Sequence, residues 1–80
     1  MERPWITSPA YKAALDAVID ARHGQKLSQR QLADRLGKPR SFVSKIENRE
    51  RRLDFVEFVV IARALGLEPV ELLRRVVAVI

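Results

Sequence analysis

The side chains that could do chemistry in this 80-residue chain are mainly cationic, and they gather in its middle. Ten basic and three acidic residues lie between Arg22 and Arg52, which gives this span a net charge of +7. The rest of the chain has five basic and seven acidic residues and a net charge of −2. A polyanion is the natural partner of such a patch, although a basic face kept for solubility is an equal alternative on charge alone.

Catalysis and metal binding find little support in the sequence. The chain has no cysteine, so it forms neither disulfides nor thiolate metal sites, and this composition fits a reducing compartment. His23 is the only histidine and has no partner residue to complete a metal site, so we expect it at the surface. No nucleophile–base pattern is visible, and the chain is too short to shield one. We expect no enzyme, cofactor, metal or small-molecule ligand.

No segment has the character of a membrane span or a signal peptide. The longest uninterrupted apolar stretches are residues 58–62 and 76–80, far shorter than the roughly 18 residues that a membrane span needs. The first residues, with Glu2, Pro4 and Pro9, contain no long apolar core. We therefore expect a cytoplasmic protein without a membrane partner.

The elements that position the basic residues are predicted to be five helices, which makes the fold class all-α. Ser8 is expected to cap the first helix ahead of Pro9, and Gly24 to end it. Two capping-box pairs open the second and fourth helices, Ser28 with Gln31 and Asp54 with Glu57. The third helix is predicted over about residues 39–48. Gly66 ends the fourth helix, and Glu68 and Pro69 open the fifth.

Apolar residues at spacings of three and four mark the five predicted helices, and in the first four they form the inward face. In chain order these residues are Tyr11, Leu15, Val18 and Ile19, then Leu32, Ala33 and Leu36, then Val43 and Ile46, then Phe58, Ile61, Ala62 and Leu65, and finally Leu72, Leu73 and Val76.

The second and third predicted helices have the spacing of a helix-turn-helix unit. Ala33 lies four positions before Gly37, and Val43 and Ile46 lie six and nine positions after it. A small residue lets the two helix axes approach, and glycine takes the positive φ that the tight turn requires at low cost. The apolar pair gives the crossing helices one shared contact. The third helix would then be free to enter a DNA major groove.

Residues 27–73 resemble the Xre/Cro-type helix-turn-helix domains of phage repressors and bacterial regulators. The matching pattern reads Leu-Ser-Gln-x-x-Leu-Ala-x-x-Leu-Gly, then Ser-x-Val-Ser-Lys-Ile-Glu, then an apolar helix ending Ala-x-Ala-Leu-Gly. The resemblance implies a five-helix lambda-repressor-like bundle over residues 8–80, preceded by an N-terminal arm of residues 1–7. Trp5 is expected to pin this arm onto the domain, or else to mark a partner contact.

The same resemblance implies which side chains read base edges: Arg40, Ser41, Ser44 and Lys45. Arginine and lysine can donate to guanine O6 and N7, and serine can pair with several base edges. Arg40 is the strongest candidate because its planar guanidinium can engage guanine through two hydrogen bonds. A phosphate contact remains open for Arg40 and Lys45, and the two serines are alternatively plain helix-surface residues.

The resemblance also implies phosphate contacts at both ends of the unit. The expected residues are Ser28, Gln29, Asn48 and Arg49, with Arg51 and Arg52 extending the surface. The family usually has glycine where this chain has Arg49, which would alter the turn there while adding a cation. Arg51 and Arg52 are alternatively solvated loop residues.

Four further residues have roles that the resemblance suggests or leaves open. Arg22 and Glu47 align with an inward ion pair between the first and third helices, so we expect a structural role for both. Phe42 stands where relatives often carry a small hydroxyl residue, and it is expected either to pack or to touch a thymine methyl. Pro39 replaces a capping hydroxyl and is expected at the first position of its helix.

Surplus apolar residues late in the chain predict a homodimer. Phe55, Val56, Val59 and Val60 lie beside the inward face of the fourth helix, and residues 72–80 form, with part of that helix, the expected interface. The alternative is that the fifth helix folds back on its own domain. The predicted function is a sequence-specific double-stranded DNA-binding transcriptional regulator, a repressor acting as a dimer on an inverted-repeat operator. The alternative is an antitoxin or interaction module that binds a partner protein, such as a toxin, with autoregulatory DNA binding.

Overall fold

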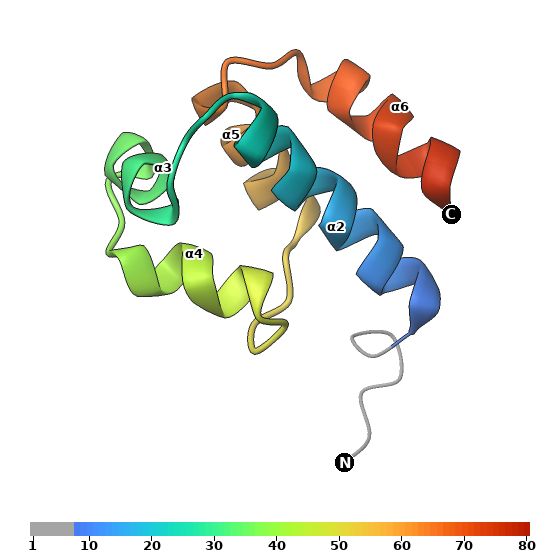
Figure 1. Cartoon of the computed structure of the whole chain (residues 1–80), viewed down its shortest axis with the longest axis horizontal. Helices are drawn as coiled ribbons and strands as arrows, with labels where there is room; N and C mark the ends of the chain where they lie inside the picture. Colours follow the sequence, from blue (N-terminus) through green and yellow to red (C-terminus); the bar gives the residue numbers. More distant parts are fainter. Residues whose placement is uncertain (1–7) are drawn as a thin grey trace.

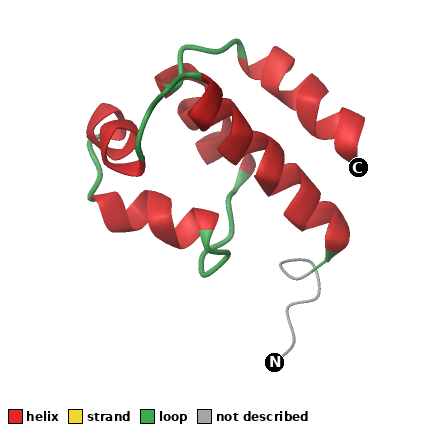
Figure 2. Cartoon of the chain, viewed as in Figure 1, coloured by secondary structure: helices red, strands yellow, loops and turns green. Residues whose placement is uncertain are grey.

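The computed structural model describes residues 8–80, and the predicted N-terminal arm with Trp5 lies outside the described residues. The described part contains helices and loops and no strand, so the predicted all-α class is confirmed (Figures 1 and 2). Its helices are α2 (Pro9–Gly24), α3 (Gln29–Leu36), α4 (Arg40–Glu47), α5 (Phe55–Ala64) and α6 (Pro69–Val79).

Side-chain caps fix the starts of α2, α3 and α5 where the sequence predicted them. The Ser8 hydroxyl accepts a hydrogen bond from the backbone N–H of Tyr11 at 3.0 Å. In the two capping boxes, the Ser28 and Asp54 side chains accept from the third helical N–H, and the side chains of Gln31 and Glu57 accept in return. These bonds satisfy backbone donors that a helix leaves unpaired at its first turn.

Pro39 precedes α4 instead of opening it. Its backbone is extended, with φ −68° and ψ 154°, and its carbonyl accepts from the N–H of Phe42 at 3.0 Å. The expectation that Pro39 occupies the first helical position is therefore wrong. The helix begins at Arg40 without a side-chain cap.

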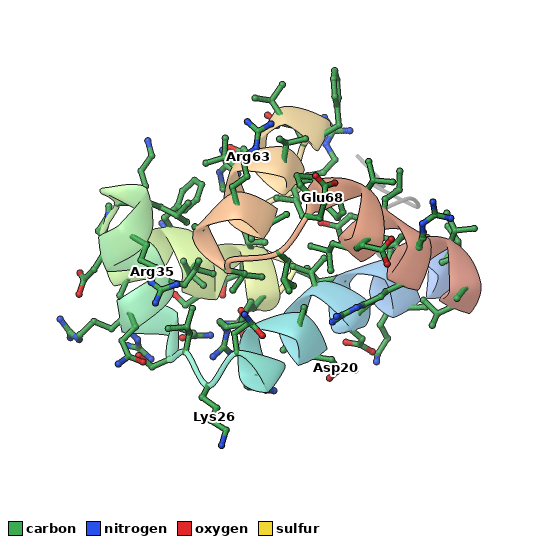
Figure 3. All side chains as sticks on the ribbon, turned by 90° about the horizontal axis from the view of Figure 1, so that it is seen from above. Asp20, Lys26, Arg35, Arg63 and Glu68 are labelled. Atoms are coloured by element: carbon green, nitrogen blue, oxygen red, sulfur yellow. The ribbon has the colours of Figure 1, made fainter. Side chains whose placement is uncertain are left out.

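Each of the helices α2 to α5 is followed within two residues by one with a left-handed backbone, and only two of these four residues are glycine. The positive φ angles are 59° at Lys26, 67° at Gly37, 61° at Arg49 and 78° at Gly66. In each case the next N–H donates to a carbonyl five residues back, as Leu27 does to Arg22 at 3.2 Å. Gly24 is the last residue of α2, but Lys26 makes the reversing turn and projects from it (Figure 3).

The helices surround one hydrophobic core. α2 packs along α6, and the two run antiparallel in Figure 1. α3 packs against α4 and α5, and α5 also contacts α6. The buried apolar residues are Leu15, Val18, Ala21, Leu27, Leu32, Ala33, Val43, Ile46, Ile61, Ala62, Leu65, Leu72 and Val76. Arg22 is the buried charged residue of the described part.

Leu73, one of the apolar residues of the last helix, has a side chain that is 49% exposed. α6 meets the core through Leu72 and Val76, which are four positions apart and therefore lie on one helix face. Leu73 is turned about 100° from Leu72 around the helix axis, because an α-helix has 3.6 residues per turn. It consequently lies beside the buried face of α6 and not on it.

None of the helices in residues 8–80 has both the length and the apolar character that crossing a membrane requires.

Candidate nucleic-acid interface

α3 and α4 form a bent helix pair whose second member has an outward face. Gly37, with its left-handed backbone, ends α3, and the N–H of Lys38 donates to the carbonyl of Ala33 at 3.0 Å. Ala33 is 1% exposed, so no larger side chain separates the helices at their crossing. Val43 and Ile46 are buried in the core and form the inner face of α4. The opposite face of α4 is left to solvent.

Three of the four side chains predicted to read bases lie on that open face. Arg40, Ser41 and Lys45 are exposed, whereas Ser44 is half-buried. The hydroxyl of Ser44 donates to the carbonyl of Ser41 at 3.3 Å, which satisfies it within its own helix. The cationic groups of Arg40 and Lys45 have no hydrogen-bond or ion-pair partner among residues 8–80. Their donors are available to a ligand that approaches this face.

The residues predicted to contact phosphates flank α4 at both ends of the unit. Ser28 is exposed at the start of α3, with its hydroxyl engaged in the capping box. The side-chain amide of Asn48 makes only a long contact of 3.5 Å to Glu50. Arg49 is exposed in the turn after α4, and its left-handed backbone is the conformation that glycine would adopt there at lower cost. Arg52 is also exposed.

Arg22 and Glu47 form a buried ion pair between α2 and α4. Arg22 Nε lies 2.7 Å from Glu47 Oε2, and Nη2 lies 2.9 Å from Oε1. The third arginine nitrogen, Nη1, donates to the carbonyl of Leu27 at 2.7 Å. Gln29 Nε2 also donates to Glu47 Oε1, at 2.9 Å, so the pair links α2, α3 and α4. It holds the start of α3 and the end of α4 in one network.

The single histidine is exposed beside this pair. His23 Nε2 lies 3.2 Å from Arg22 Nη2. This placement agrees with the expected surface position of His23.

A second network, which was not predicted from the sequence, holds the other end of α4. The ring of Phe42 is half-buried against the core and has two cations near it, with Lys38 Nζ at 5.5 Å and the Arg51 guanidinium at 4.8 Å from its centroid. Arg51 Nη1 donates to Glu57 Oε1 at 2.8 Å, and Nη2 donates to Oε2. Arg51, predicted to bind phosphate, therefore has its guanidinium engaged within the chain.

The pairing of Arg51 with Glu57 changes the protonation equilibria of both groups. The hydrogen bonds from Arg51 lower the pKa of Glu57 below its ordinary value of 4.5, against the opposing effect of burial. The same bonds raise the pKa of Arg51. Both shifts favour the charged forms, so the carboxylate and guanidinium persist as an ion pair at neutral pH.

Another basic residue of the central patch also serves the fold. Arg35 Nη1 donates to the carbonyl of Ala64 at 2.8 Å, at the end of α5 (Figure 3 labels Arg35). This bond ties α3 to α5 and satisfies a carbonyl that the end of a helix leaves without a partner. Part of the positive charge in the sequence is thus structural, while Arg40, Lys45 and Arg49 stay unpaired within the described residues.

The crossed helix pair with its outward second helix defines a helix-turn-helix domain, the arrangement that presents a helix to the major groove of DNA. Residues 19–72 match the helix-turn-helix family HTH_3, and the chain belongs to this Xre-type family. The structure of an XRE-family like protein from Pseudomonas syringae pv. tomato str. DC3000 is similar to it, with 48% sequence identity and a TM-score of 0.80. That likeness covers 86% of this chain and 84% of the other. No curated protein sequence matches. Family and fold together identify a DNA-binding regulatory domain whose partner is double-stranded DNA.

Proposed function

We propose that this chain is a sequence-specific transcriptional repressor that occludes its operator by binding double-stranded DNA. The observation that carries the proposal is the free outer face of α4, where Arg40 and Lys45 have no partner among the described residues. A helix-turn-helix domain holds that face outward on a rigid core. The binding partner implies a cytoplasmic location, at the nucleoid.

Each side chain of this surface receives a specific role in the proposal. Arg40 donates to guanine O6 and N7, and Lys45 and Ser41 contact neighbouring base edges. Ser44 makes a smaller contribution to base contacts. Ser28, Gln29, Asn48, Arg49 and Arg52 contact phosphates on either side and set the register. These contacts predict an affinity that falls steeply with salt, because each neutralised phosphate releases counterions.

Selection of bound duplexes from a random oligonucleotide pool tests the proposal directly. It should return a defined motif with two-fold symmetry. Arg40→Ala is then expected to relax the preference at one base pair, at a cost of roughly 1–3 kcal/mol on the selected site. Arg49→Ala should weaken binding to all sequences by the same factor.

Arg75→Ala serves as the matched control, because Arg75 is an exposed arginine on α6, which Figure 1 places away from α4. It should change neither property. Equal losses on all duplexes from Arg40→Ala and Arg49→Ala would defeat the assignment of roles.

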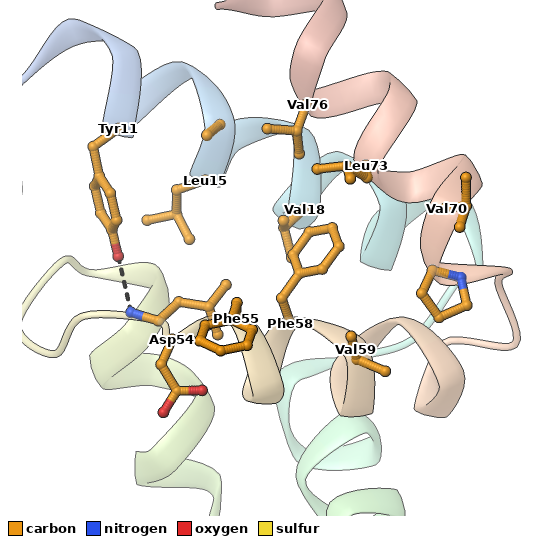
Figure 4. A pocket seen from close by; sticks show the side chains of 13 residues that line it. Tyr11, Leu15, Val18, Asp54, Phe55, Phe58, Val59, Val70, Leu73 and Val76 are labelled. Atoms are coloured by element: carbon orange, nitrogen blue, oxygen red, sulfur yellow. Dashed lines mark hydrogen bonds between the residues drawn. The ribbon is translucent and has the colours of Figure 1, made fainter.

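We further propose that the repressor acts as a homodimer. A groove of about 480 Å³ lies between α2, α5 and α6, and its lining is almost wholly apolar (Figure 4). Phe55, at 83% exposed, stands at one side of it, and Val70 and Leu73 stand at the other. Val77, Val79 and Ile80 continue the exposed apolar surface to the end of the chain. Apolar patches of this kind mark interaction sites.

Not all of residues 72–80, the expected interface, are available for contact with a second copy. Leu72 and Val76 face the core, so the contact with a second copy is assigned to the exposed residues between and beside them. A two-fold dimer would present two copies of α4 about 34 Å apart, one turn of DNA, to an inverted repeat.

Sedimentation at micromolar concentration tests the dimer. The wild type should sediment as a dimer, and Leu73→Glu as a single 9.2 kDa chain, because a carboxylate would be buried in the groove. Val56→Glu is the matched control, because Val56 is similarly exposed but does not line the groove. A wild type that remains a 9.2 kDa species would refute the dimer.

The same groove supports a second candidate function, an antitoxin-like module in which the apolar surface holds a partner protein and DNA binding is autoregulatory. A stoichiometric partner that co-purifies with the wild type and is lost from Leu73→Glu would favour this alternative.

A further inference from the structure

The N-terminal end of α4 is held by a chain of contacts that begins on α5. The Glu57 carboxylate is fixed at the first turn of α5, where Oε1 accepts from the N–H of Asp54 at 3.1 Å. The Glu57 N–H in turn donates to the Asp54 side chain at 2.7 Å. This reciprocal bonding leaves the carboxylate little rotational freedom. It presents both oxygens to Arg51.

Arg51 transmits that fixed position to the ring of Phe42. Its guanidinium is held by two hydrogen bonds to Glu57, and a further bond of 3.2 Å runs from Nη1 to the carbonyl of Arg52. The planar group lies 4.8 Å from the centroid of the Phe42 ring, within the range of a cation–π contact. Lys38 lies 5.5 Å from the same ring. The ring therefore contacts a cation from the segment that precedes α4 and one from the segment that follows it.

The contacts of Phe42 and Glu47 anchor opposite ends of the helix. Glu47 is bound to Arg22 at the C-terminal end, and Phe42 lies five residues earlier, about 7.5 Å along the helix axis. The buried pair of Val43 and Ile46 sets the face that α4 turns inward, but one apolar stripe leaves the helix free to tilt. Two anchors at separate ends remove that freedom. Arg40 lies two residues before Phe42, so the second anchor determines where Arg40 points.

We propose that Arg51 is a positioning residue for the recognition helix, which acts through Phe42 and Glu57, and that it does not neutralise a phosphate. This inference rests on the proposed role of α4 in reading bases. It assigns Arg51 a different task from Arg49, although both are arginines in the same connector. The preference of the domain for its own DNA sequence depends on Arg51. The number of phosphates that the domain contacts does not depend on Arg51.

The test compares two quantities for each variant: the ratio of affinities for the selected duplex and a scrambled duplex, and the slope of log affinity against log salt. Arg51→Lys keeps the charge but loses the planar fork that binds Glu57 and stacks on Phe42. A positioning role predicts that its affinity ratio falls about tenfold, comparable with loss of one well-placed base contact, while the slope is unchanged. A phosphate role predicts a nearly wild-type ratio for Arg51→Lys.

Glu57→Gln provides independent evidence, because it leaves every basic residue in place and glutamine can still complete the capping box. It should lower the affinity ratio as Arg51→Lys does, again without changing the slope. Phe42→Leu, which keeps an apolar side chain but removes the ring, should do the same. Arg49→Ala is the positive control for the slope, whose magnitude should decrease by about 0.9 on the loss of one phosphate contact.

Two results would overturn the inference while leaving the proposed function intact. One is a wild-type affinity ratio in both Arg51→Lys and Glu57→Gln. The other is a slope whose magnitude decreases by about 0.9 in Arg51→Met, as it should in Arg49→Ala. A wild-type chain with no preference between the selected and scrambled duplexes would instead overturn the proposed function, and this inference with it.

Discussion

Removing the buried partner of Glu47 should cost this domain a large part of its stability. In Arg22→Met, the side chain keeps much of its length but loses the charge and all of its donors. The Glu47 carboxylate, whose side chain is 10% exposed, is then left with Gln29 as its donor, and the carbonyl of Leu27 loses a bond of 2.7 Å. Breaking a buried pair by removing one partner costs about 3–5 kcal/mol.

That loss can be compared with the total that a domain of this size has available. At 0.05–0.15 kcal/mol per residue, 80 residues give a free energy of unfolding of roughly 4–12 kcal/mol. Arg22→Met should therefore lower the melting temperature by about 12 °C or more, since 1 kcal/mol corresponds to about 4–8 °C in small domains. Urea titration followed by circular dichroism would measure the free energy, with an unchanged m-value expected.

The exposed pair Lys12–Asp16 supplies a matched control. Its N···O distance is the same 2.7 Å, but the two side chains are 56% and 50% exposed. Lys12→Met should cost less than about 0.5 kcal/mol, because a pair in water gains little over its solvated ions. The double variant Arg22→Met, Glu47→Leu should recover most of the loss, because no buried charge remains. Similar small losses from Arg22→Met and Lys12→Met would refute the argument that burial decides the cost.

Three further predictions concern the turns and the second network. Gly37→Ala should destabilise the fold by about 1–2 kcal/mol through the positive φ of Gly37 alone, since an added Cβ meets no neighbour. Gly24→Ala, within α2, should instead stabilise the fold by about 0.5–1 kcal/mol. Equal effects of the two substitutions in thermal unfolding would contradict this. Arg49→Gly should raise the melting temperature slightly by relieving the same strain while weakening DNA binding, and a lower melting temperature would count against it. Glu57 has a lowered pKa in the fold, so its pairing with Arg51 stabilises the fold fully above about pH 4.5, and this stabilisation is lost as the pH falls through the folded pKa. The difference in free energy of unfolding between the wild type and Glu57→Gln should therefore become smaller from pH 6 to pH 3. A difference that stays constant over this range would disprove the linkage.

The local signals in the sequence were sufficient for the helices and for the bend between α3 and α4. Ser8, Ser28 and Asp54 cap their helices as predicted, because a cap joins residues only three positions apart and depends on little else. The spacing of Ala33 and Gly37 likewise predicted the tight crossing, which needs one small residue and one left-handed turn. The outward placement of Arg40 and Lys45 follows from the inward placement of the residues between them.

Helix-ending turns show where residue type alone was misleading. Gly24 ends the first helix as predicted, but the left-handed residue of the turn that follows is Lys26, and Arg49 takes the same conformation after α4 although glycine adopts it at lower cost. The hydrogen bonds to Arg22 and Lys45 carbonyls fix where each turn occurs, and the following residues, Leu27 and Glu50, donate them. A side chain with an intrinsic cost is accepted where such bonds determine the backbone.

The sequence by itself determined that this is an all-α helix-turn-helix domain with a basic outer helix, because capping, periodicity and charge act over a few neighbouring residues. Tertiary structure alone decided which cations remain available. Arg35 and Arg51 are bound to α5, through the Ala64 carbonyl and Glu57, whereas Arg40 is free among the described residues. An arginine carries the same charge in either setting, so composition cannot distinguish them. The paths of the loops determine the difference, because they bring a carbonyl or carboxylate to one guanidinium and leave another facing solvent.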